Sequence, residues 1–272
     1  MPRKPYGGDR RKLVIALDLG MTFSGASYCI LDPGVVPQIQ CVTRYPAQKN
    51  VSGPSAKIPT VLYYDQSGDL KAAGAEALDE NVVRSAEDEG WVKYSRFKLH
   101  LCPKWALIEE INEQIVPLPS GKDVVEVFGD FYAYLIKCTL TFIQESHQNG
   151  SDVLSSCEDH IEYIISHPNG WDGVQQEKLL RAAVYAGLIS DNDKGHERIH
   201  FVTEGEAILH FCVDRGLFPL LRGVMVIDAG RGTVDINTYS SISSTNTDSQ
   251  SFEEIVPPAC IFSGSVFVTR RA

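Results

Sequence analysis

The sequence predicts an α/β protein, because short apolar runs typical of strands alternate with segments typical of helices. Residues 122–148 carry apolar side chains at three- and four-residue spacing, which predicts a long helix packed against a sheet or another helix. Residues 13–19 (LVIALDL) and 223–228 (GVMVID) are compact apolar runs that predict buried strands. The chain has 272 residues, of which 43% are hydrophobic, so it is long enough for one large domain or two smaller ones.

Two strands joined by a tight turn are expected at the start of the chain. Residues 13–19 form the first strand, Gly20-Met21-Thr22 the turn, and residues 23–31 the second strand. The next expected elements are a short strand at 61–64, a helix at 71–88, irregular chain at 102–120 and the long helix at 122–148. The irregular segment is expected because it holds three prolines.

The second half of the chain continues the alternation. Strands are expected at 160–166, 199–202, 223–228 and 234–239. Asp172 is followed three residues later by Gln175, which is the spacing of a helix capping box. Thr203 and Glu206 have the same spacing, so a helix is expected to begin at each pair. Residues 240–251 are polar and of low complexity, which predicts a hairpin tip or a loop.

Composition and cysteine spacing exclude several classes of function. The formal net charge is −10, so the chain lacks the basic excess of a general nucleic-acid binder. The seven cysteines show no C-x-x-C spacing, which favours free thiols in the cytoplasm or nucleus over disulfides or a zinc site. No apolar stretch approaches about 18 residues, and no cleavage pattern follows the basic start, so no membrane partner is expected.

Two segments share one design, in which an apolar strand ends in Asp and is followed by a glycine-containing turn with a Thr and a second strand. They are LDLGMTFSG near the start and VIDAGRGTVD near the end of the chain. The shared residues are Asp18, Gly20 and Thr22 in the first segment, and Asp228, Gly230, Gly232 and Thr233 in the second.

This design suits the binding of phosphates. Glycine allows positive φ and close approach to a ligand, and consecutive N–H groups in such a turn can bind an anion. An Asp at the strand end is repelled by phosphate but can hold Mg²⁺ through water. Two such hairpins facing each other would hold a triphosphate from both sides. No Walker motif or G-x-G-x-x-G sequence offers another phosphate site.

At these residues the chain resembles the actin-like ATPase domain of the heat shock protein 70 kDa superfamily, and within it the heat shock 70 kDa protein 12A-like branch. The resemblance rests on six segments in the family's order: LVIALDLGMTFSGASY, FKLHL (97–101), ISHPNGWDGVQQEKLLRAAVYAGL (165–188), FVTEGEAILHF (201–211), VMVIDAGRGTVDINTY and FSGSVFVTRRA (262–272). It implies the actin-like ATPase (ribonuclease H-like) fold, with nucleotide bound between two lobes. The implied organisation is an N-terminal tail (1–12), a first lobe (13–220) with a smaller inserted subdomain (46–119), and the opening strands of an incomplete second lobe (221–272).

The resemblance also implies roles for individual residues in binding MgATP and in the attack of water on the γ-phosphate. Gly20, Met21, Thr22 and Phe23 would line the first phosphate loop, and Gly230, Arg231, Gly232 and Thr233 the second. Asp18 and Asp228 would order the Mg²⁺ hydration shell, and Asp228 would also take part in catalysis. Lys98 would lie near the γ-phosphate, and Glu204 would complete the network around the attacking water. The implied partners are ATP or ADP and client proteins or co-chaperones, in the cytoplasm or nucleus.

Two residues depart from the family pattern and keep other functions open. Met21 replaces a threonine, which removes a hydroxyl near the phosphates. Arg231 replaces a glycine, so its side chain must either fit the turn or distort it, and its guanidinium could instead pair with phosphate. One alternative is therefore an interaction scaffold that binds nucleotide weakly or not at all, and another is a sugar- or acetate-kinase-like phosphotransferase.

Three site residues also have ordinary structural interpretations. Lys98 could belong to a solvated basic face, Glu204 could complement its helix dipole, and Asp235 is expected to be a strand or turn aspartate rather than a ligand. Residues 221–272 are expected to be the least stable part, because strands without covering helices expose apolar faces and open edges.

Overall fold

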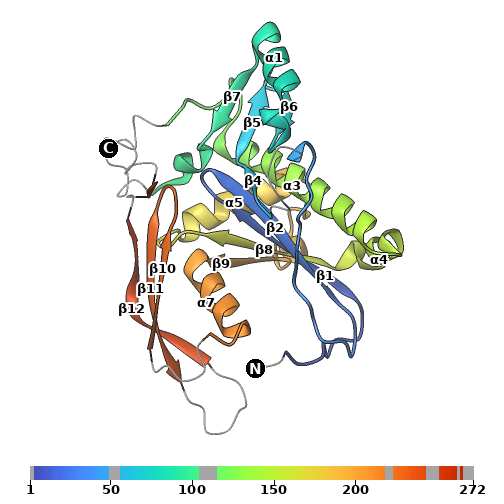
Figure 1. The fold of residues 1–272 in the computed structure, drawn as a ribbon, viewed down its shortest axis with the longest axis vertical. Coiled ribbons are helices and arrows are strands. Elements are labelled where there is room, and N and C mark those ends of the chain that lie inside the picture. Colours follow the sequence, from blue (N-terminus) through green and yellow to red (C-terminus); the bar gives the residue numbers. More distant parts are fainter. Residues whose placement is uncertain are drawn as a thin grey trace. The chain divides into compact units, whose positions relative to one another are not determined.

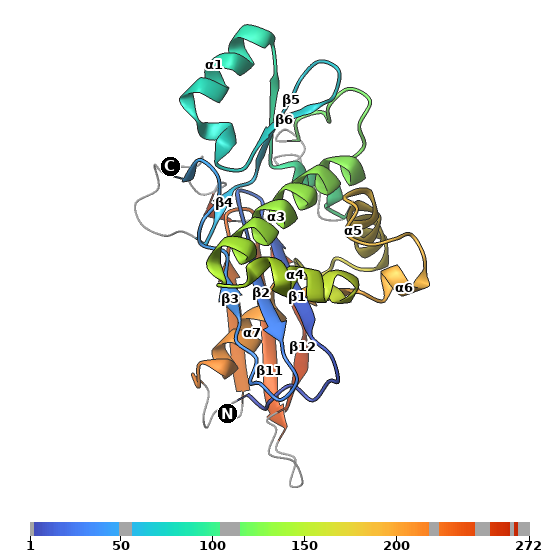
Figure 2. The same ribbon diagram turned by 90° about the vertical axis from the view of Figure 1, so that its right-hand side faces the viewer.

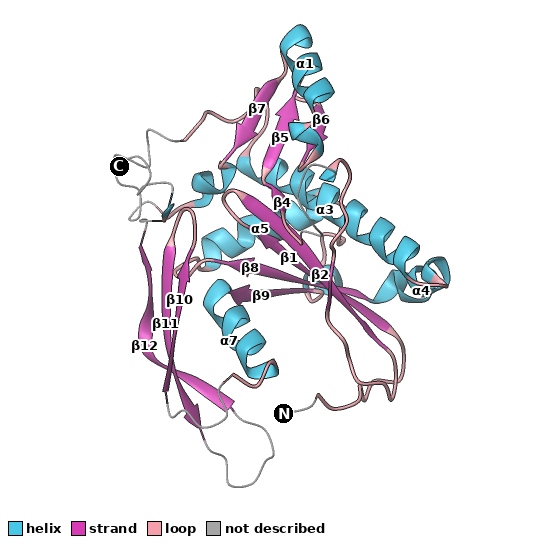
Figure 3. Cartoon of the chain, viewed as in Figure 1, coloured by secondary structure: helices cyan, strands magenta, loops and turns pink. Residues whose placement is uncertain are grey.

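The chain is a mixed α/β protein, which confirms the predicted class (Figures 1 and 3). The computed structural model describes residues 3–48, 56–103, 115–217, 223–242, 251–261 and 264–265. They form two compact units. The larger unit comprises Pro5–Ile165 and Asp172–His200, and the smaller unit comprises Met1–Lys4, Ser166–Trp171 and Phe201–Ala272. The lobe boundaries implied by the resemblance stay a prediction.

The main sheet of the larger unit grows from the first two strands. Its order is β3 (Gln40–Cys41), β2 (Phe23–Leu31), β1 (Lys12–Leu19), β8 (Ile161–His167) and β9 (Ile199–Thr203). β1 pairs antiparallel with β2 and parallel with β8, and β4 (Ile58–Pro59) also pairs with β2. Alternate residues of β1 are buried, because successive side chains of a strand point to opposite faces of the sheet.

The long helix α3 (Val124–Ser146) confirms the helix predicted at 122–148 and packs against β2 and α5 (Gly173–Tyr185) (Figure 2). Asp123 caps it, accepting the N–H of Glu126, while the Glu126 carboxylate accepts the N–H of Asp123. Gly129 allows the close approach of α5, because a Cβ there would lie 2.4 Å from Tyr185 Cδ1. The remaining elements of this part are α4 (Gly150–Cys157), η5 (Glu158–His160) and α6 (Asp193–His196).

A second, three-stranded sheet lies within the larger unit. Its order is β6 (Leu70–Ala73), β5 (Val61–Tyr64) and β7 (Val92–Ser95), with η2 (Glu76–Leu78) and α1 (Glu80–Glu89) beside it. Val61, Tyr63 and Ala86 share a small core there. The helix predicted at 71–88 is therefore wrong in its first half. Gly74 has a φ of 62°, which turns the chain between β6 and η2, so the helix begins only after its cap at Asp79.

The smaller unit contains an antiparallel sheet in the order β10 (Gly223–Ala229), β11 (Val234–Ile242) and β12 (Ser251–Ile261). Helix α7 (Glu204–Asp214) packs on β10 and β11. Leu209, Val224 and Tyr239 belong to the core between them. The alternate residues of β10 are exposed, with Met225 at 61% and Ile227 at 58%. One face of this sheet thus carries uncovered apolar side chains.

Of the two capping interactions predicted at the starts of α5 and α7, the structure shows only the one at α7. Thr203 caps α7 and accepts the N–H of Glu206 at 3.1 Å, as predicted. Asp172 precedes α5, but its side chain makes no capping hydrogen bond, so the capping box with Gln175 is wrong. Of the predicted loop at 240–251, both ends belong to β11 and β12, and residues 243–250 lie outside the described residues.

The cysteines agree with the expected absence of disulfides. All seven cysteines are free thiols, as predicted, and three of them (Cys29, Cys138 and Cys157) are buried. Among the helices in the described ranges, none combines the length and the apolar character that crossing a bilayer requires.

Hydrogen exchange should distinguish the two units. The amides of β10 and β11 are expected to exchange at least about tenfold faster than the central amides of α3, because the strands have one uncovered face and belong to a small sheet. Native-state exchange followed by mass spectrometry measures this. Equal protection in the strands and in α3 would refute the expected weakness of residues 221–272.

Asp123→Ala is expected to lower the free energy of unfolding by about 1 kcal/mol, because it removes the carboxylate that accepts the N–H of Glu126. Asp172→Ala is a matched control, since it removes an exposed Asp at a helix start that makes no capping hydrogen bond. Urea denaturation should show less than half the effect for the control. Equal losses would assign the effect to charge near the helix rather than to the cap.

Candidate functional site

The first glycine turn is fixed by contacts with the chain itself. A Cβ on Gly20 would lie 2.3 Å from the carbonyl oxygen of Phe23, so only glycine fits. Gly20 does not have positive φ, and neither does Gly230 or Gly232, so these three positions do not use the left-handed backbone that glycine allows. Close packing of the hairpin is the reason for Gly20.

Thr60, which lies between β4 and β5, holds this turn in place. The Thr60 amide donates to the carbonyl oxygen of Thr22, and its Oγ1 donates to the carbonyl oxygen of Gly20, both at 2.9 Å. Ser24 Oγ donates to Thr60 Oγ1 at 2.7 Å, and both hydroxyl-bearing residues are buried. Met21 and Thr22 are partly exposed, and Phe23 is 46% exposed. The residues expected to line the first phosphate loop are thus accessible on a braced turn.

Asp18 lies at the end of β1, directly opposite Gly25 of β2. Its Oδ2 accepts a hydrogen bond from Nζ of Lys57, the residue that precedes β4. Each of the two side chains is 46% exposed. The carboxylate expected to order Mg²⁺ is therefore paired with an ammonium group.

Lys98 is buried, with 8% exposure, on the 3-10 helix η3 (Phe97–Leu101). This contradicts its interpretation as part of a solvated basic face. The Phe97 ring packs against the Phe128 ring of α3 at 5.3 Å between centroids. Arg96, just before the helix, has a φ of 59°, a left-handed conformation that is rare for a non-glycine residue.

The second turn joins β10 to β11 and is closed by its own backbone. The Gly230 amide donates to the carbonyl oxygen of Thr233 at 2.9 Å. Residues 264–265 add two bonds, from Gly264 N–H to Gly232 and from Ser265 N–H to Gly230, both to carbonyl oxygens at 3.1 Å. Arg231 is exposed and does not have positive φ, so its side chain fits the turn without backbone strain.

Asp228 pairs in register with Asp235 across this hairpin. Asp235 is 1% exposed, and its Oδ1 accepts the N–H of Asn169 at 3.0 Å. Its Oδ2 is buried and has no hydrogen-bond partner among the described residues. A buried carboxylate oxygen without a hydrogen bond lowers the stability of the fold, so binding of a proton, a water molecule or a cation at this atom would be favourable.

Two buried amide side chains surround this carboxylate. Asn169 Nδ2 donates to Asn237 Oδ1 at 2.9 Å, and Asn237 Nδ2 donates back to Asn169 Oδ1 at 3.2 Å. Asn237 Nδ2 also donates to Glu254 Oε1 of β12 at 3.2 Å. The pair thus ties the chain after β8 to the second hairpin within the smaller unit.

Glu204 is the first residue of α7, and Gly205 after it packs on the buried amide of Asn237. A Cβ on Gly205 would lie 1.9 Å from Asn237 Oδ1. Nearby in the same core, burial raises the pKa of Tyr239 to about 12. In the larger unit, burial raises the pKa of Cys102 to about 12, although Lys98 opposes the shift. Cys102 is therefore a neutral thiol at physiological pH and not a nucleophile.

The candidate residues fall into two groups. Asp18, Gly20, Met21, Thr22, Phe23 and Lys98 belong to the larger unit, and Glu204, Asp228, Gly230, Arg231, Gly232 and Thr233 to the smaller unit. Within the described ranges, no three His, Cys, Asp or Glu side chains are grouped to hold a metal ion.

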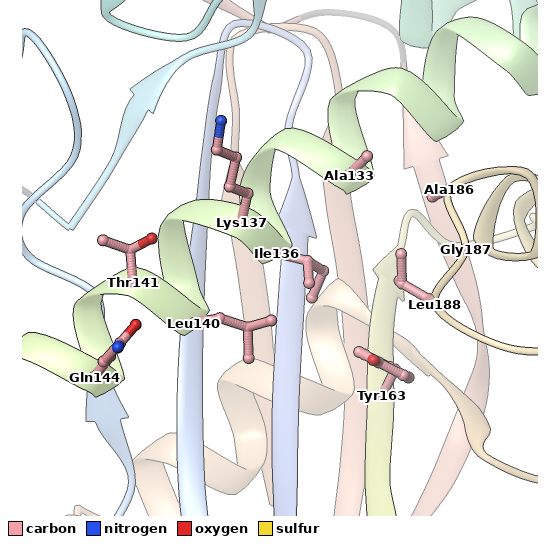
Figure 4. A pocket seen from close by; sticks show the side chains of 10 residues that line it. All are labelled: Ala133, Ile136, Lys137, Leu140, Thr141, Gln144, Tyr163, Ala186, Gly187 and Leu188. Carbon is pink, nitrogen blue, oxygen red and sulfur yellow. The ribbon is translucent and has the colours of Figure 1, made fainter. Parts of the chain in front are cut away.

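A shallow groove elsewhere in the larger unit contains none of these residues. It lies between α3, β8 and the chain at 186–188, and Ile136, Leu140 and Tyr163 are among the side chains that line it (Figure 4). Its lining is mainly apolar and brings together no group of catalytic side chains.

Comparison with known proteins adds no assignment. No family model matches the chain, and no curated protein matches it either. The family resemblance therefore remains a prediction from the residues quoted above.

Several residues of these sites were missed from sequence. Lys57, Asn169 and Asn237 were not singled out, because nothing in their local sequence marks them. Asp235 was expected to be a strand or turn aspartate rather than a ligand, and it lies in strand β11. Its full burial is visible only in the fold. The cross-strand position of Asp235 opposite Asp228 could have been inferred from the hairpin itself, since a tight turn fixes the register.

Gly20→Ala is expected to destabilise the larger unit by about 1–3 kcal/mol, because the new Cβ collides with the Phe23 carbonyl. Gly173→Ala is the control, since a Cβ there meets nothing within 4 Å and its φ is not positive. Thermal unfolding followed by circular dichroism should show a clear loss only for Gly20→Ala. Equal behaviour of the two variants would mean that the turn relaxes at little cost.

Proposed function

We propose that this chain is an ATP-binding domain of the heat shock protein 70 kDa superfamily, with the actin-like fold and a chaperone-type ATPase activity. MgATP would be bound by the phosphate loops at Gly20–Phe23 and Gly230–Thr233. The observation that carries the proposal is the pair of aspartates across the second hairpin, with Asp235 Oδ2 buried and unsatisfied in the described structure.

Two carboxylates in register on neighbouring strands repel each other, and burial of one of them strengthens the repulsion. A divalent cation with oxygen ligands would relieve both the repulsion and the orphaned oxygen. Mg²⁺ fits this donor set, because it commonly binds one or two carboxylates together with water and substrate phosphates. When bound, it would neutralise charge on the phosphate oxygens.

The remaining residues would position the reacting groups. Lys98 is a buried ammonium in a water-poor setting, where its attraction to a phosphate oxygen is stronger than at the surface. Glu204 would orient the attacking water by accepting one of its hydrogen bonds. Attack on the γ-phosphorus forms the new P–O bond as the bond to the β–γ bridging oxygen breaks, which releases ADP and phosphate.

The cellular setting is part of the same proposal. Free cysteines suit the cytoplasm or the nucleus, where thiols stay reduced. Client proteins or co-chaperones would be the macromolecular partners.

A scaffold with weak or no nucleotide binding is the second candidate. It is favoured by the closure of the second turn, where the Gly230 amide is already bonded to the Thr233 carbonyl and is not presented to a ligand. Met21 also lacks the hydroxyl that a threonine would offer to the phosphates.

Calorimetric titration with MgATP tests the choice. Saturable binding is expected, and Asp228→Asn and Asp235→Asn should each weaken it at least about tenfold, because each removes a charge that faces the metal. Asp152→Asn, an exposed aspartate in the first turn of α4, is the charge-matched control and should leave the affinity unchanged.

The absence of binding at millimolar MgATP, in a sample shown to be folded by circular dichroism, would refute the ATPase proposal and favour the scaffold. Binding that is insensitive to both hairpin substitutions would place the nucleotide elsewhere.

A further inference from the structure

Lys57 is held against the first hairpin by more than its ion pair. It directly precedes β4, which pairs with the start of β2 through Ser24↔Ile58 and Phe23↔Pro59. Thr60, just after β4, bonds to the carbonyl oxygens of Gly20 and Thr22 in the turn. Backbone pairing on one side of Lys57 therefore fixes the place from which its side chain reaches Asp18.

Gly25 makes room for this arrangement. It lies directly opposite Asp18 in the hairpin. A Cβ on Gly25 would lie 2.4 Å from the carbonyl oxygen of Ala56 and 3.1 Å from Cδ of Lys57. Any other residue at position 25 would push away the chain that carries the lysine. The glycine opposite Asp18 is thus the structural condition for the ion pair.

The pair is placed where a phosphate could reach it. Both side chains are 46% exposed at the end of the strand that leads into the glycine turn. A half-exposed ion pair adds little to stability and rearranges easily. An ammonium group has three N–H donors, so one can remain on Asp18 while another bonds to a phosphate oxygen.

We propose that Lys57 is a phosphate-binding residue of the first hairpin, and that its ammonium bridges Asp18 and the phosphate chain of the nucleotide. The inference rests on the proposed function. In this proposal the ammonium group of Lys57 is the cation of the first hairpin, and Asp18 orients it. The divalent cation is then bound at Asp228 and Asp235 of the second hairpin. Phosphate binding at the first hairpin then does not depend on Mg²⁺.

The test compares wild type, Lys57→Met and Lys71→Met by calorimetry, with ATP and with inorganic triphosphate, each in Mg²⁺ and in EDTA. Lys71 pairs with Asp65 in the same unit and provides a control with the same change of charge and a similar loss of a surface ion pair. Lys57→Met should weaken binding at least about tenfold in both conditions, the loss expected for one charge-assisted hydrogen bond. Lys71→Met should stay within about twofold of wild type. Circular dichroism confirms that the variants fold.

Other outcomes separate the two proposals. If wild type binds MgATP but Lys57→Met binds as well or better, Lys57 only occupies the carboxylate, and this inference is wrong while the proposed function stands. If wild type binds ATP only in Mg²⁺ and triphosphate not at all, the metal-independent role is also wrong. If wild type binds no nucleotide in either condition, both proposals fail together.

Discussion

A carboxylate at the end of a strand needs a positive charge or hydrogen-bond donors close by, and the two hairpins meet this need differently. In the first, β4 brings Lys57 to Asp18, and Gly25 leaves the space for it. In the second, Asp228 faces Asp235, and part of the compensation comes from the Asn169 amide. One carboxylate oxygen there stays unsatisfied among the described residues. The proposed functions of both hairpins follow from this contrast.

The buried amide pair of Asn169 and Asn237 gives the smaller unit a specific arrangement. A fully bonded polar network inside a core specifies one packing, because any displacement leaves costly unsatisfied groups. Gly205 fits against this pair without a side chain, which sets the start of α7 and therefore Glu204 relative to β11. The uncovered face of β10 adds no such buried contacts, since Met225 and Ile227 are exposed there. The specific packing of this unit thus comes from the face of the sheet that α7 covers.

Local patterns in the sequence were sufficient to predict most of the helices and strands. The apolar spacing of α3 and the cap of α7 at Thr203 depend on neighbours within four residues, so the sequence pattern reveals them. No strand was predicted over β12. Its Pro257 and Pro258 do not favour a central strand, and the structure places β12 at an edge of the sheet, where prolines are tolerated. The ion pair of Lys57 with Asp18 could not be predicted, because it joins residues 39 positions apart through the register of β4.

The surroundings of Lys98 show how packing can direct a charged side chain. Left-handed backbone at Arg96 costs about 1 kcal/mol or more for a residue with a Cβ, so neighbouring contacts must hold it. Phe97 provides such contacts, since its ring packs against both Phe128 and Phe131 of α3. Once Phe97 is anchored, Lys98 has to follow inside the protein, where burial of its ammonium group carries a desolvation cost. The backbone strain at Arg96 and the buried charge of Lys98 therefore both result from the packing of Phe97 against α3. A protein that needs a preorganised cation for a phosphate has a reason to retain both.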